Sequence, residues 1–245
     1  PDLEKEIPAG VAVYRAPLLE PYIMYRRFTG RQADESSDMA TLSLDGRQKR
    51  KWSERISEFV RAGFFVPDAR MTWLYPAVHL GKQICRQHDI RLIYSSAPPY
   101  TTHLIGRRLA AWSDKPWVAD FRDSWIGWLS TPQWRPFWAA SLERRMEKAV
   151  LTRADRLLTV SNGVKEDLLS RHPLLRDERW QLLPNGYDAE DFNLSAPEKS
   201  DYSTITYTGS MYGTRNPAYL FPALAPFRRP DPGVCARLRL RLVAP

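Results

Sequence analysis

Charged residues follow an apolar run near the middle of the chain. The segment WVADFRDSW begins like a buried strand and then places Asp120, Arg122 and Asp123 close together. A buried strand needs no such ending, so the charged residues either cap the strand structurally or mark a working site. Ion pairs in loops are common and often contribute little to stability. The segment alone leaves both interpretations open.

A second stretch, YTGSMYGTRN, has the parts of an anion-binding loop. A predicted strand leads to Gly209, Ser210, Gly213 and Arg215, and a helix should start near Pro217. Free backbone N–H groups, a helix N-terminus and a cation at one place favour phosphate binding. A plain glycine turn would look the same, so the loop is weak evidence by itself.

Polar stretches also follow other predicted strands, in SSAPPYTTH, SNGVKED and PNGYD. Ligands of open α/β sheets bind beyond the carboxyl ends of the strands. The residues that we expect to line such a cleft are Ser96, Pro98, His103, Asp120, Asn185 and Gly186. For His103, capping or packing is the alternative to ligand contact.

The histidines and cysteines show no metal-ligand spacing. His79, His88 and His172 are unpaired in the sequence, and Cys85 and Cys235 lie far apart. Asp120 and Asp123 could mimic a carboxylate pair for a metal, but Arg122 stands between them. We expect no metal site and no cofactor.

Strand and helix patterns alternate along the chain, which predicts an α/β fold with a Rossmann-like parallel sheet and helices on both faces. The short β-rich runs are 10–17, 90–96, 116–121, 155–161 and 180–188. The helical patterns are 51–64, 76–86, 98–112, 134–154 and 162–172.

Composition is that of a globular protein, with 43% hydrophobic residues among 245. The net charge of +8 favours polyanionic partners, but the basic residues are scattered and form no known nucleic-acid-binding motif. We therefore expect no nucleic acid partner. No apolar run is long enough to cross a membrane, and the cysteine usage fits a reducing compartment, so we expect a cytoplasmic protein.

Two domains are expected. Residues 1–195 form the first, and its first strand and loop are expected to precede residue 1. Residues 196–203 lose hydrophobicity and gain Pro, Ser and charge, as a linker does. Residues 204–245 begin a second β-α-β unit that is too short to close a core of its own.

Several motifs together resemble glycosyltransferase family 4, which has the GT-B fold of two facing Rossmann-like domains. The motifs, in family order, are FVPDARMTW, YSSAPPYTTHLIG, PWVADFRDSW, ADRLLTVSNGVKEDL, LLPNGYDAEDF and ITYTGSMYGTRNPAYLFPAL. The resemblance implies a retaining, metal-independent enzyme with a nucleotide-sugar donor on the C-terminal domain and a glycan or lipid-linked acceptor on the N-terminal one. Because part of each domain is missing, we expect this chain to be inactive by itself.

The resemblance also assigns roles to residues. Arg215 and the loop around Gly209 would hold the donor diphosphate. Arg122 and Asp123 stand where many relatives carry a His-Asp pair, so they should face the reacting groups. Since Arg replaces His, an electrostatic role in offsetting charge on the leaving diphosphate is expected for Arg122, and not a general-base role.

Residues 46–65 combine basic and aromatic side chains. An ordinary solvated helix face would explain the pattern, but peripheral proteins bind anionic membranes in this way. The cations that would contact the inner membrane face are Arg47, Lys49, Arg50 and Lys51. Two rival functions are a sugar-nucleotide epimerase of the same two-domain architecture and a basic nucleic-acid-binding module.

Overall fold

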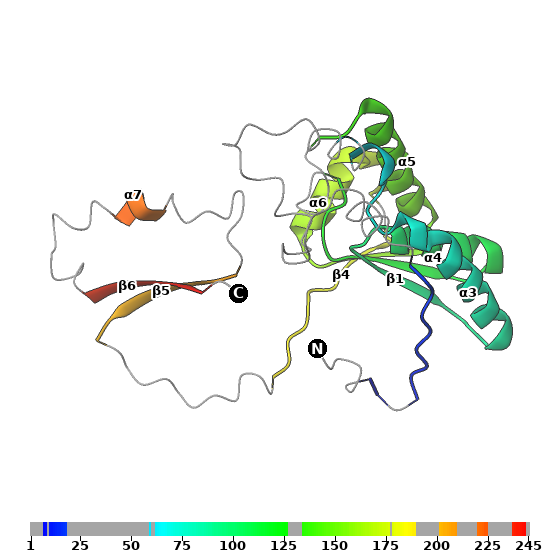
Figure 1. Ribbon diagram of the computed structural model, residues 1–245, viewed down its shortest axis with the longest axis horizontal. Coiled ribbons are helices and arrows are strands. Elements are labelled where there is room, and N and C mark those ends of the chain that lie inside the picture. Colours follow the sequence, from blue (N-terminus) through cyan, green and yellow to red (C-terminus); the bar gives the residue numbers. More distant parts are fainter. Residues whose placement is uncertain are drawn as a thin grey trace, which may run out of the picture. The chain divides into compact units, whose positions relative to one another are not determined.

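The computed structural model describes residues 7, 8, 10–18, 59, 62–126, 134–176, 178–189, 201–209, 220–224 and 237–243. These residues belong to two units, one with described residues up to Asn185 and one that starts at Gly186 (Figure 1). Each unit contains its own sheet.

The first unit has a four-stranded parallel sheet in which the strands follow one another in chain order. The strands are β1 (Ile93–Ala97), β2 (Trp117–Phe121), β3 (Arg156–Thr159) and β4 (Trp180–Leu182). The helices are α3 (Leu74–Gln87) before β1, α4 (Thr101–Ser113), α5 (Phe137–Arg153) and α6 (Asn162–Arg171) between the strands, and short 3-10 helices at Met71–Trp73 and Pro173–Leu175. The predicted Rossmann-like α/β fold is confirmed.

One face of this sheet is covered by helices. Each strand of this sheet is added next to the previous one in the same direction. When all the crossovers have the same hand, their helices lie on the same side of the sheet. Figure 1 shows α4, α5 and α6 on one side. Burial alternates accordingly along β1, where Ile93, Ser95 and Ala97 are buried while Tyr94 is 54% exposed.

The core lies between this sheet and its helices. Trp117, Phe121 and Trp125 have no exposed surface, and Leu157, Leu168 and other aliphatic side chains surround them. Burial of such large apolar side chains is the main force that holds the helices on the sheet.

The second unit contains a parallel pair of strands. It consists of β5 (Ser203–Thr208), α7 (Leu220–Leu224) and β6 (Leu238–Val243). The strand, helix and strand occur in the order predicted for 204–245. Residues 196–200 of the predicted linker lie outside the described residues, so the domain boundaries stay predictions.

The N-terminal run 10–17 is extended but is not paired into a sheet within the described ranges. Tyr14 Oη lies 2.8 Å from His88 Nε2 at the end of α3. Of the predicted helix 51–64, Phe59 and residues 62–64 are helical, and the remaining positions lie outside the described residues.

Candidate active site

The carboxyl ends of the four strands meet at one edge of the first sheet. The residue after each of three strands donates its backbone N–H to the last residue of the neighbouring strand: Arg122 to Ala97 at 3.0 Å, Val160 to Phe121 at 3.3 Å and Leu183 to Thr159 at 2.9 Å. The polar stretches that follow these strands therefore start side by side, as the topology predicts.

Asp120 is fixed by two hydroxyl groups of the adjacent strand. Tyr94 Oη and Ser96 Oγ each donate to Asp120 Oδ2 at 2.7 Å. The side chain lies on the sheet face opposite the helices, yet only 7% of the residue is exposed. Burial, together with the hydrogen bond to Asp120, raises the pKa of Tyr94 to about 12, so its phenol remains a donor at neutral pH. The carboxylate is thus held in one orientation beside the edge.

Arg122 presents an exposed guanidinium at the same edge. Its Nη2 donates to the carbonyl oxygen of Pro98 at 2.8 Å, which links the end of β2 to the loop after β1. A guanidinium has five N–H donors, so one bond to a carbonyl leaves capacity for an anion. Asp123 follows as a half-buried residue. Arg122, Pro98, Ser96 and Asp120 are therefore brought together.

His103 lies in the core and not at this edge. The ring has no exposed surface, and its Nδ1 is 2.9 Å from Ser95 Oγ, which also accepts the indole N–H of Trp117 at 2.9 Å. Burial lowers the pKa of His103 to about 3, so the imidazole is neutral. This placement supports the packing role and corrects the expectation of acceptor contact, because a fully buried ring offers no surface to a ligand.

Side chains accept hydrogen bonds at the N-termini of two helices at this edge. Asp68 accepts the backbone N–H of Thr101 at 2.9 Å and its hydroxyl at 2.8 Å, which caps α4. Ser161 caps α6 by accepting the N–H of Val164 at 3.2 Å. An anion at this edge would therefore rely on side-chain donors such as Arg122 more than on helix N–H groups.

The remaining predicted residues belong to other parts of the chain. Asn185 is exposed after β4, and Gly186 starts the second unit. Gly209 follows β5 with φ +136° and donates its N–H to Val243 O at 2.9 Å. A φ in this range favours glycine, which is what an anion-binding turn also requires. Ser210, Gly213 and Arg215 lie outside the described residues, as do Arg47, Lys49, Arg50 and Lys51.

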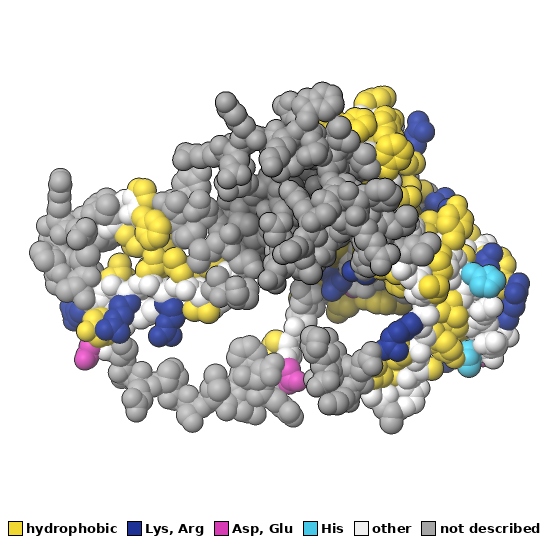
Figure 2. All heavy atoms as spheres, viewed as in Figure 1, with side chains coloured by type: hydrophobic (Ala, Val, Ile, Leu, Met, Phe, Trp, Pro, Cys, Tyr) yellow, Lys and Arg dark blue, Asp and Glu magenta, His cyan; other side chains and the backbone are white. Residues whose placement is uncertain are grey.

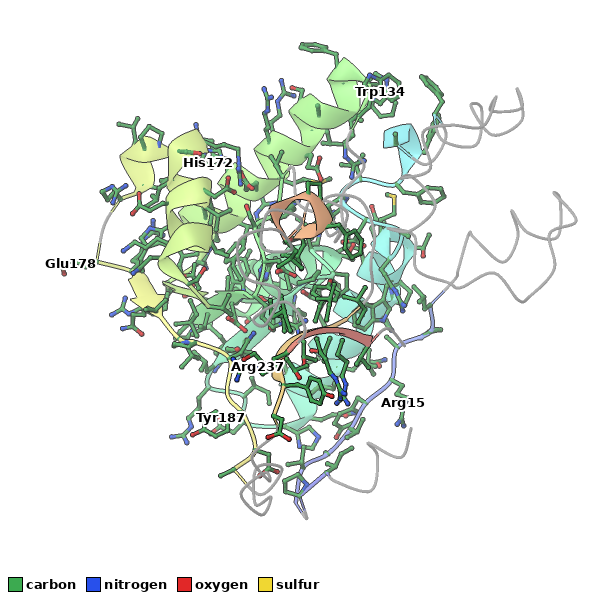
Figure 3. The ribbon with its side chains drawn as sticks, turned by 90° about the vertical axis from the view of Figure 1, so that its left-hand side faces the viewer. Arg15, Trp134, His172, Glu178, Tyr187 and Arg237 are labelled. Carbon is green, nitrogen blue, oxygen red and sulfur yellow. The ribbon has the colours of Figure 1, made fainter. Side chains whose placement is uncertain are left out.

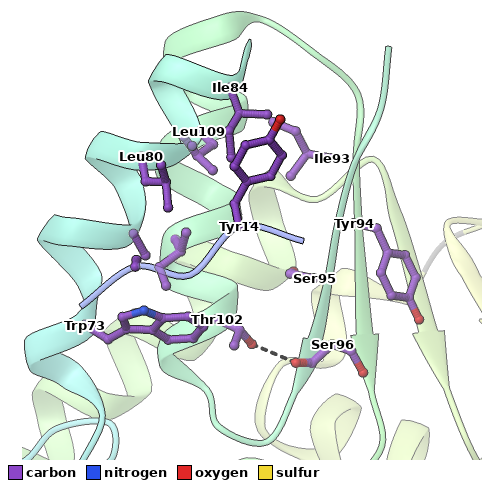
Figure 4. Close-up of a pocket in the computed structure, with 15 residues that line it drawn as sticks. Tyr14, Trp73, Leu80, Ile84, Ile93, Tyr94, Ser95, Ser96, Thr102 and Leu109 are labelled. Atoms are coloured by element: carbon purple, nitrogen blue, oxygen red, sulfur yellow. Dashed lines mark hydrogen bonds between the residues drawn. The ribbon is translucent and has the colours of Figure 1, made fainter. Parts of the chain in front are cut away.

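A cavity of about 300 Å³ that sequence reasoning missed lies beside β1 (Figure 4). Its walls come from α3, α4, β1 and the extended N-terminal run, and apolar side chains dominate them, including Trp73, Leu80, Ile84 and Leu109. Thr102 Oγ1 donates to Ser96 O at 2.8 Å on its polar side. The apolar lining suits a hydrocarbon group better than a diphosphate.

Neither a metal-ligand cluster nor a membrane-spanning helix occurs in the described part of the chain. No cluster of three or more His, Cys, Asp or Glu side chains there could hold a metal ion. No helix there is long and apolar enough to pass through a bilayer.

Comparisons with known proteins identify the family. A Listeria monocytogenes protein described as a UDP-N-acetylglucosamine 2-epimerase is similar in structure, with a TM-score of 0.33 and 11% identity over 71% of this chain. The match covers 51% of that protein, so this chain spans about half its length. No curated protein matches the sequence. The model of Glycosyltransferase Family 4 matches residues 31–191, well over half of the chain, and the chain therefore belongs to glycosyltransferase family 4.

Proposed function

We propose that this chain is part of a glycosyltransferase that moves a sugar from a nucleotide-sugar donor to a glycan or lipid-linked acceptor. The acceptor binds at the carboxyl edge of the first sheet, and the donor binds the second unit through the loop that begins at Gly209. The reaction retains configuration, needs no metal ion and takes place in the cytoplasm.

The arrangement around Arg122 is the observation that supports this proposal most. An exposed guanidinium is held by the carbonyl of Pro98 beside the anchored carboxylate of Asp120. In this role Arg122 offsets negative charge that develops on the leaving diphosphate, and Asp120 orients acceptor hydroxyl groups. A preorganised charge of this kind stabilises a transition state without reorganising during the reaction.

The test uses the protein with a panel of nucleotide sugars and extracted glycan and lipid acceptors. Removal of Arg122 by Arg122→Ala should lower kcat by about 10²-fold or more, and Arg122→Lys should restore part of it. Arg91→Ala is the matched control, because Arg91 is an exposed arginine just before β1, at the other end of the same sheet. An unchanged kcat in Arg122→Ala would contradict the assigned role.

Product analysis separates the proposal from the rival enzyme class. With a nucleotide sugar alone, a transferase leaves the sugar configuration unchanged, whereas an epimerase converts it.

Calorimetry tests the loop that would bind the donor. Arg215→Ala should weaken donor binding, because charge-assisted bonds to a diphosphate are strong; equal affinity would count against the loop.

A further inference from the structure

Exposed aromatic side chains gather where α5 begins. We call the following six residues the aromatic patch: Phe59, Phe64, Trp134, Phe137, Trp138 and Leu142, which are between 40% and 89% exposed. Two ring contacts connect the segment that contains Phe59 and Phe64 to the start of α5: the ring centroids of Phe59 and Trp134 lie 6.1 Å apart, and those of Phe64 and Trp138 lie 5.8 Å apart. Figure 3 shows Trp134 at the end of the helix. Single exposed aromatics are ordinary, but a contiguous group usually marks an interaction site.

The acidic residues of α5 point away from this surface. Glu143 Oε2 lies 2.7 Å from Arg135 Nε, and the fully buried Glu147 lies 2.9 Å from Arg171 Nε. Both carboxylates are thus neutralised inside the protein.

The exposed charges that remain on this helix are positive. Arg144, Arg145 and Lys148 are exposed. By their spacing, Arg145 and Lys148 lie on the side of the helix away from its buried positions, and Arg144 lies at the flank. In Figure 2 yellow hydrophobic and dark-blue Lys or Arg side chains lie next to each other over α5, at the upper right. The outward face of α5 therefore carries aromatic rings in its first turns and cations in the turns that follow.

We propose that the aromatic patch and the three cations of α5 form a docking surface for an anionic lipid bilayer. Tryptophan and phenylalanine rings are suited to the boundary between headgroups and acyl chains. Each basic residue near an anionic surface adds to the electrostatic attraction. With its carboxylates turned inward, α5 places no acidic side chain against the lipid phosphates. The surface goes beyond the proposed reaction, and the cations at 47–51 are not needed for it.

The test measures binding of the whole chain to phosphatidylcholine vesicles that contain about 30% phosphatidylglycerol, without any sugar donor. Phe137→Ala should weaken co-sedimentation about tenfold, which corresponds to about 1.4 kcal/mol. Arg145→Glu should weaken it by about tenfold or more and reduce its salt dependence. The matched controls are Leu174→Ala, at an apolar residue that is 97% exposed outside the patch, and Arg91→Glu. Both should bind like the unchanged chain.

Quenching by brominated acyl chains gives a second readout. Tryptophan fluorescence of the unchanged chain should fall on binding. The quenching should be smaller in the double variant Trp134→Phe/Trp138→Phe. It should be kept in Trp112→Phe, because Trp112 is exposed on α4, outside the patch. Equal binding by Phe137→Ala and the unchanged chain would overturn the proposal. So would a dimer in sedimentation velocity that Phe137→Ala dissociates while vesicle binding is unaffected. Because no transfer is measured, either failure leaves the proposed reaction standing.

Discussion

Replacing Glu147 by Gln tests the ion pair that joins α5 to α6. The carboxylate has no exposed surface, and it lies 2.9 Å from Arg171 Nε, 3.0 Å from Arg171 Nη2 and 2.9 Å from His172 Nε2. Removing one partner of a buried pair usually costs 3–5 kcal/mol because the other charge is left uncompensated. In this variant Arg171 is partly exposed and still has a carboxylate partner, because its Nη1 lies 2.8 Å from Asp167 Oδ2. We therefore expect a loss of about 3 kcal/mol in the free energy of unfolding, at the lower end of this range.

Urea unfolding, followed by tryptophan fluorescence, measures this loss as a lower midpoint, by about 1 M or more. The matched control is Glu166→Gln, which removes an exposed carboxylate that lies 2.7 Å from Arg176; its midpoint should hardly move, because water screens the pair. In the double variant Glu147→Gln/Arg171→Gln, the loss in the free energy of unfolding should be smaller than the sum of the losses in the two single variants. If Glu147→Gln and Glu166→Gln lowered the midpoint equally, the reasoning would be refuted.

Three further predictions concern the core. Gly106→Ala would place a Cβ 2.6 Å from Trp117 Nε1 and should lower the free energy of unfolding by about 1–3 kcal/mol through overpacking. The control is Gly163→Ala, whose Cβ would meet only ordinary contacts. In the same urea titration this control should be neutral or stabilising. Burial lowers the pKa of His103 from 6.5 to about 3, so the free energy of unfolding should decrease as pH falls from about 6.5 towards 3. In His103→Gln, unfolding measured across that pH range should show a smaller decrease. Burial raises the pKa of Glu143 from 4.5 to about 7 although Arg135 lowers it; stability should therefore decrease as pH rises between these values, and Glu143→Gln should show no such decrease.

Much of the first sheet could be predicted because its signals are local. Short apolar runs between helical patterns gave β1 to β4 within a few residues, and the parallel topology then placed Arg122 beside Pro98. The cap on α4 could not be predicted, because Asp68 and Thr101 are 33 residues apart and no local pattern connects them. His103 was ambiguous for a related reason, since its neighbours Ser95 and Trp117 come from two different strands.

The inward acidic residues of α5 were also beyond sequence reasoning. Glutamate in a helix is usually solvated, and Glu143 and Glu147 are buried only because Arg135 and Arg171 approach from outside the helix.

Because Asp68 accepts two hydrogen bonds from Thr101, a residue before α3 restrains the chain at the carboxyl edge of the first sheet. Thr101 follows the loop that holds Pro98, and the carbonyl of Pro98 steadies the guanidinium of Arg122. Without the carboxylate of Asp68, the loop after β1 would be less restrained, and the guanidinium of Arg122 would be less well positioned for the role proposed above.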